Sequence, residues 1–89
     1  MNRYLIETTH AREECIHVLK NFVIYGHITN FEWGCENGVC AGWAIIEAES
    51  VEQALLSVPS FSRDKTKVIK LSRFTPEKIQ GFHEELPGR

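Results

Sequence analysis

The sequence predicts an α+β fold, and three observations support this prediction. Apolar residues recur at helical spacing over residues 10–25, strand-like segments occupy residues 3–9 and 39–48, and Asn37-Gly38 marks a tight hairpin turn. The predicted order of elements is βαββαβ followed by a C-terminal helix. Two split β-α-β units of this kind form a ferredoxin-like sandwich, in which helices cover one face of a four-stranded antiparallel sheet.

The first strand and the first helix follow from residue type and spacing. Residues 3–9 are dominated by β-branched and aromatic side chains, which favour a strand. Over residues 10–25 the apolar side chains fall on one helical face, formed by Ala11, Cys15, Val18, Leu19 and Phe22. Thr9 or His10 can cap the start of this helix, and Gly26 is placed to end it.

Residues 29–36 and 39–48 are predicted to form a hairpin through a type I′ turn at Asn37-Gly38. Such a turn fixes the register and pairs residues whose numbers sum to 75. The pairs include Cys35 with Cys40, Trp33 with Gly42, and Glu32 with Trp43. One face of the hairpin is then almost wholly apolar and is expected to lie beneath the helices. It contains Phe31, Trp33, Cys35, Cys40, Gly42, Ala44 and Ile46.

The second half of the chain repeats the pattern of helix and strand. Ser50 and Gln53 match a capping box. The helix that follows has an apolar stripe of Val51, Ala54, Leu55 and Val58. Pro59 is expected to close this helix, residues 67–72 are predicted as the last strand, and Thr75-Pro76 is typical of a helix start.

The opposite face of the predicted sheet combines apolar side chains with charged ones. Its members are expected to include Leu5, Glu7, Glu32, Trp43, Ile45, Val68 and Lys70. A face that met only water would be more polar, and a closed core would not hold Glu32 beside Trp43 without a partner. We therefore expect a second copy of the chain to cover this face and to leave a cavity for a small molecule.

Within that face, Glu7, Glu32, Trp43 and Lys70 form the candidate ligand-binding site. Burial against an indole raises the pKa of a carboxyl group, so Glu7 or Glu32 could act as a general acid or base. His10 follows the first strand and is a third candidate for proton transfer, or a metal ligand. A salt bridge within a dimer interface would explain the same charged residues.

The three cysteines allow several interpretations. Cys35 and Cys40 could be small core residues, a redox pair, or two metal ligands that His10 might join. A structural zinc site usually needs four ligands, and Cys35-x₄-Cys40 supplies half of that set. An odd number of cysteines without an export signal predicts reduced thiols and a cytoplasmic location.

Charge and motifs exclude several function classes. The net charge of −2 and the scattered cations argue against a nucleic-acid partner, and the short apolar runs argue against a membrane span. No phosphate-binding loop, nucleophile elbow or HExxH motif is present, so no cofactor is expected. The composition, 43% hydrophobic over 89 residues, predicts one domain spanning residues 1–89 with a thin core.

The element order, the hairpin run from Ile28 to Glu49 and the Glu49-Ser50-Val51-Glu52 helix entry resemble the dimeric α+β barrel superfamily. That superfamily includes muconolactone-isomerase-like proteins, cofactorless monooxygenases, YCII-like proteins and small uncharacterised bacterial families, some reported to bind nickel. The resemblance implies a homodimer with a ligand pocket, and its members differ in activity. The expected function is binding of a small molecule near the sheet face; the alternatives are a cofactorless isomerase or monooxygenase, a metal-binding domain, or a thiol redox domain.

Overall fold

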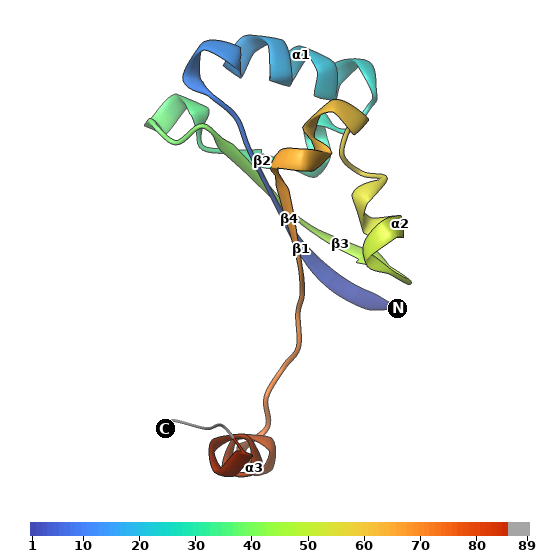
Figure 1. The fold of residues 1–89 in the computed structure, drawn as a ribbon, viewed down its shortest axis with the longest axis vertical. Coiled ribbons are helices and arrows are strands. Elements are labelled where there is room, and N and C mark those ends of the chain that lie inside the picture. The colour runs from blue at the N-terminus through green and yellow to red at the C-terminus, as the bar shows by residue number, and fades with distance from the viewer. Residues whose placement is uncertain (86–89) are drawn as a thin grey trace.

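The computed structural model describes residues 1–85, with side chains through residue 81, and shows an α+β architecture (Figure 1). A four-stranded antiparallel sheet has the order β2-β3-β1-β4. The strands are β1 (Asn2–Thr9), β2 (Glu32–Trp33), β3 (Ala41–Ala48) and β4 (Thr66–Lys70). The α-helices are α1 (Cys15–Ile24), α2 (Val51–Leu55) and α3 (Pro76–Glu85). Short 3₁₀ segments are η1 (Arg12–Glu14), η2 (Ile28–Asn30), η3 (Cys35–Asn37) and η4 (Ser60–Lys65).

Strand β1 is central and pairs with β3 on one side and β4 on the other. Because side chains alternate along a strand, Tyr4, Ile6 and Thr8 point toward the helices and are almost fully buried. They join a core whose other members come from α1, α2 and their flanking segments and from β3. These members are Val18, Phe22, Phe31, Ala44, Ala48, Ala54 and Val58.

Three aromatic rings form the part of the core nearest β2. Phe22 meets Phe31 and Trp33 edge to face, with ring centroids 5.2 Å and 4.8 Å apart. Trp33 lies flat over Gly42, where an added Cβ would come within 2.5 Å of the indole. Any larger residue at position 42 would collide with the indole, so this position has to be glycine. The structure also confirms the predicted pairing of Trp33 with Gly42.

The hairpin register is confirmed, but the predicted turn is wrong. Glu32 pairs with Trp43 and Trp33 with Gly42, as the sum of 75 requires. Strand β2 then ends, and the single 3₁₀ turn of η3 leads to Gly38 at φ 88°. A type I′ turn needs positive φ at both central residues, and among the described residues only glycines have it. Cys35 and Cys40 consequently lie in the connecting loop and are not partners across the strands.

Helix α1 is shorter than the predicted span of 10–25. Ala11 is extended, and the His10 N–H donates to the Cys40 carbonyl at 3.1 Å, which continues the pairing between β1 and the start of β3. The helix begins only after η1. Its end agrees with the prediction, because Gly26 has φ 77° and the His27 N–H bonds to the Phe22 carbonyl at 2.8 Å.

The second helical segment follows its predicted cap. The Ser50 hydroxyl accepts from the Gln53 N–H at 3.1 Å, and the Gln53 side chain accepts in return from the Glu49 N–H. Ala54 and Val58 are fully buried. The loop after α2 is tied to it by Arg63, whose Nε donates to the carbonyls of Leu55 and Val58.

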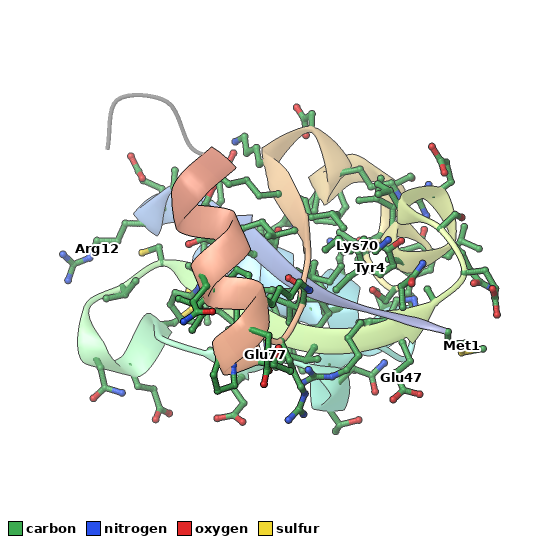
Figure 2. The ribbon with its side chains drawn as sticks, turned by 90° about the horizontal axis from the view of Figure 1, so that it is seen from below. Met1, Tyr4, Arg12, Glu47, Lys70 and Glu77 are labelled. Atoms are coloured by element: carbon green, nitrogen blue, oxygen red, sulfur yellow. The ribbon has the colours of Figure 1, made fainter. Side chains whose placement is uncertain are left out.

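The expected orientation of β4 is wrong, whereas that of β1 is confirmed. Val68 pairs with Ile6 and packs against the core, and Lys70 pairs with Tyr4 on the same side of the sheet. Figure 2 shows Tyr4 and Lys70 close together. The alternate residues of β4, Lys67 and Ile69, take the opposite side. Lys70 therefore does not belong with Glu7, Glu32 and Trp43.

We call the side of the sheet away from α1 and α2 the open face. It contains Arg3, Leu5, Glu7, Thr9, Glu32, Ala41, Trp43, Ile45, Glu47, Lys67 and Ile69. Its apolar members remain accessible: Ile45 is 55% exposed and Ile69 is 47% exposed.

Helix α3 lies away from the sheet at one end of the long axis of the molecule (Figure 1). An extended segment after β4 leads to it, and the Thr75 hydroxyl caps its first turn by accepting from the Lys78 N–H at 3.2 Å. Side chains described on α3 are mostly exposed, including Ile79 at 41%. Among the described residues, no helix is long and apolar enough to cross a membrane.

The two tryptophans should respond differently to truncation. Trp33 is only half-buried, but Trp33→Ala removes an indole that packs on Phe22, Phe31 and Gly42, so we expect a loss of about 3 kcal/mol of unfolding free energy. Trp43→Ala removes a half-buried ring on the open face and should cost less than about 2 kcal/mol. Thermal and urea unfolding of both variants side by side checks this. The opposite ranking would contradict the assignment of the two faces.

Candidate functional site

Three potential metal ligands meet at the end of the sheet nearest the start of α1. They are His10, Cys15 and Cys35, and their ligand atoms all lie within 4.8 Å of one another. His10 follows β1, Cys15 is the first residue of α1, and Cys35 follows β2 in η3. Each side chain comes from a different element, so the cluster exists only in the folded chain.

The local structure around each residue explains why these side chains converge. His10 continues the even-numbered series of β1 that points toward the helices, whereas Cys35 lies in the 3₁₀ turn that follows the end of β2. Cys15 precedes the buried Val18 by one turn of α1 and shares its inward side. The same patterns that build the core therefore bring an imidazole and two thiols together at its edge.

The imidazole of His10 is held largely by packing. Only 9% of the residue is exposed, Nε2 lies 3.6 Å from the Cys35 Sγ, and the ring centroid is 6.3 Å from that of Trp33. Nδ1 is buried and makes no hydrogen bond to any described residue. Burial lowers the pKa of His10 below its ordinary value; Glu14 opposes this shift and Lys65 adds to it. The ring is therefore neutral near pH 7, the form that binds metal ions.

The thiol of Cys35 is held in its protonated form. Burial raises the pKa of Cys35 to about 11, and the hydrogen bond with Cys15 and the proximity of the Cys15 and Cys40 sulfurs act in the same direction. All three cysteines are free thiols. With a pKa of about 11, Cys35 is a poor nucleophile near neutral pH, which disfavours thiol catalysis at this position.

A cleft opens onto the thiols of Cys15 and Cys35. Its volume is about 330 Å³, and it is lined by Arg12, Cys15, Cys35, Glu36, Gly38 and Cys40. Figure 2 shows the Arg12 side chain pointing outward at this end of the molecule. Cys35 and Cys40, which the sequence suggested as a pair, thus share this cleft although they are not strand partners. The cleft gives a solute direct access to the thiols.

The sheet-face candidates form a separate and shallower site. The Trp43 Nε1 donates to the Glu7 carboxylate at 3.2 Å, and Glu32 pairs with Trp43 across β2 and β3. A depression of about 300 Å³ is lined by Leu5, Glu32, Trp43, Ala44 and Ile45. His10 and Lys70 both lie on the other side of the sheet, so the structure does not unite the four residues predicted to bind a ligand.

Cys15 is the functional candidate that the sequence reasoning missed. It was assigned to the apolar face of the helix with Val18 and Phe22, and that placement is confirmed. The signal that could have identified it is its place on the first turn of the helix, close to the end of β1 that is followed by His10.

His17 lies outside the cluster, where its carbonyl accepts from the Asn21 side chain at 2.9 Å.

Comparison with known proteins adds no assignment. The chain matches no protein-family model, and no curated protein or solved structure is significantly similar to it.

Cys35 should resist alkylation until the solution is strongly basic. A pKa of about 11 leaves about one thousandth of the group as thiolate at pH 8. We expect the rate of Cys35 modification by iodoacetamide, measured by peptide mass spectrometry, to rise about ten-fold per pH unit between pH 8 and 10. A rate that levels off below pH 9 would contradict the protonated, buried thiol.

Proposed function

We propose that this protein is a metal-binding module whose primary ligands are His10, Cys15 and Cys35. The observation that carries the proposal is the convergence of three ligand atoms from three separate elements within 4.8 Å. A bound metal ion requires this arrangement, in which donor atoms of a buried histidine and two half-buried cysteines surround one point at the edge of the core.

The spacing suits a four-coordinate ion. With Zn–S and Zn–N bonds of about 2.3 Å and 2.05 Å, tetrahedral angles separate sulfur from nitrogen by about 3.6 Å and sulfur from sulfur by about 3.8 Å. The observed distance from His10 Nε2 to Cys35 Sγ is 3.6 Å. Small side-chain movements would bring the remaining pairs, now within 4.8 Å, to the same separation.

The donor set selects the class of metal. Thiolate and imidazole ligands favour borderline and soft ions such as Zn²⁺ and Cu⁺ over Mg²⁺ or Ca²⁺, which prefer oxygen. A bound cation would also displace the proton that Cys35 retains, because a coordinating thiol is deprotonated. His10 would bind the ion through Nε2, the ring nitrogen that lies 3.6 Å from the Cys35 Sγ.

We expect the chain to bind one equivalent of Zn²⁺. Cys35→Ser should weaken the affinity at least a hundred-fold, measured by competition with a chromophoric chelator. Because only the folded chain assembles the site, Zn²⁺ at a hundred times its Kd should stabilise the fold by about 2.7 kcal/mol.

His17→Ala is the matched histidine control for the zinc experiment. His17 lies on α1 but outside the cluster, so its removal should leave zinc affinity unchanged. A wild-type chain that binds no Zn²⁺ under reducing conditions, or a Cys35→Ser variant with wild-type affinity, would overturn the proposal.

A second candidate function is supported by the open face. We infer that the fold is a ferredoxin-like sandwich, because the strand order read from the β4 edge is β4-β1-β3-β2. We also infer a homodimer in which the second copy covers the open face and encloses a small-molecule site near Trp43. The accessible Ile45 and Ile69 beside the Trp43–Glu7 hydrogen bond favour the dimer, since aromatic residues are enriched at interfaces and the buried centre of an interface is more apolar than the rest of the surface.

The charge distribution favours a second copy as the occupant. Glu32 lies on β2 at one edge of the open face, and Lys67 lies on β4 at the other edge. Two such sheets related by a two-fold axis parallel to the strands place β2 of one copy over β4 of the other. Glu32 of each copy then lies opposite Lys67 of the other copy, so one such ion pair can form at each edge of the interface.

Sedimentation tests the dimer. We expect the wild-type chain to sediment as a dimer at micromolar concentration, and Ile45→Lys to be monomeric because it places a charge at the centre of the open face. Glu32→Lys should weaken association about ten-fold, and adding Lys67→Glu should restore it.

Ile24→Lys is the control for the sedimentation series. Ile24 is 74% exposed on α1, in the other layer of the molecule, so this variant should remain dimeric. Dissociation of the Ile24 variant alone would place the interface on α1, and a monomeric wild-type chain would remove the dimer altogether.

A further inference from the structure

We propose that Cys40 is the fourth ligand of the metal site, which closes it into a four-coordinate Cys₃His zinc centre. The inference rests on the proposed metal binding and specifies its coordination. It distinguishes a closed site from a three-ligand site that keeps a position open for water or substrate.

Cys40 shares the surroundings of the other ligands. It is half-buried and lines the same cleft as Cys15 and Cys35. Its sulfur is also near enough to Cys35 to influence the ionisation of that thiol. The cleft thus contains every cysteine of the chain, gathered from α1 and from both ends of the loop between β2 and β3.

The backbone fixes residue 40 against the existing ligands. Its carbonyl accepts from the His10 N–H at 3.1 Å, which ties it to the residue that supplies the imidazole. Within the loop, the Gly34 N–H donates to the Ala41 carbonyl and the Val39 N–H to the Gly34 carbonyl, each at 3.0 Å. These bonds hold Cys35 and Cys40 at the two ends of a closed loop, with the four-residue spacing common in zinc ligand pairs.

A side-chain rotation would complete the set. The three-residue cluster within 4.8 Å does not include Cys40, so its sulfur now lies farther from at least one of the other ligand atoms. A cysteine has a single side-chain torsion, and a change between staggered positions moves Sγ by about 3 Å without moving the backbone. The hydrogen bonds of residues 34–41 can therefore remain in place as the site closes.

The closed site would carry one net negative charge, from three thiolates and Zn²⁺. Two charged residues line the cleft, of which Arg12 offsets this charge and Glu36 adds to it. Four protein ligands leave no coordination position for water. The closed centre would thus stabilise the junction of β1, α1 and the β2–β3 loop and would not activate a water molecule for hydrolysis.

Cobalt substitution counts the thiolates directly. We expect Co²⁺ bound to the wild-type chain to show the strong visible bands of a tetrahedral ion and near-ultraviolet charge-transfer absorption from three thiolates. Cys40→Ser should retain the metal with at least ten-fold weaker affinity and lose about one third of the charge-transfer absorbance. Unchanged absorbance and affinity in this variant would refute the fourth ligand while leaving the three-ligand site intact.

Thiol protection provides a second measurement that needs no mutation. In the zinc-loaded wild-type chain, Cys15, Cys35 and Cys40 should all be protected from N-ethylmaleimide by at least ten-fold relative to the chelator-treated chain, as read by mass spectrometry. Modification of Cys40 alone in the zinc-loaded chain would overturn the inference. Failure of the wild-type chain to bind any metal would instead overturn the proposed function, so the two failures are distinguishable.

Discussion

The alternation of side chains along β1 is the constraint on which the rest of this structure depends. Because β1 pairs on both edges, its even-numbered residues must all face the helices and its odd-numbered residues the open face. That parity buries Tyr4, Ile6 and Thr8, and its next member is His10. A shift of one residue would bury Glu7 in the core and turn His10 away from the thiols, so the fold and the cluster of His10 with the two thiols depend on the same register.

The imidazole beside the thiols is costly for the stability of the fold. A buried Nδ1 without a partner costs about 1–3 kcal/mol, whereas the Cys35 thiol, whose pKa is raised to about 11, remains neutral and buries no charge. A core under selection for stability alone would have apolar side chains at these positions. The cluster lies at the core's edge, beside a cleft through which a cation could reach the thiols and displace the Cys35 proton. The cost at Nδ1 would remain, because the ion would bind the other ring nitrogen, Nε2.

Much of the fold was predictable because its signals are local. The register that pairs Trp33 with Gly42 and the helix end at Gly26 were both predicted, whereas the type of turn between the paired strands was not. The orientation of β4 was not, because Val68 and Ile69 are both apolar and neighbouring lysines give no alternation. The site was half predictable: His10 and Cys35 were candidates, whereas the spacing of Cys15 is that of any core residue, and only tertiary packing shows which neighbours it meets.

The displaced position of α3 affects how large the molecule appears in solution. The radius of gyration is 16.1 Å and the longest dimension is 47 Å, whereas a compact chain of 89 residues has a radius of gyration of about 12 Å. By the same scaling, 16.1 Å is the radius of gyration of a compact chain of about 190 residues. On a sizing column, one extended copy would therefore elute close to two compact ones, and mass would have to be measured independently of shape.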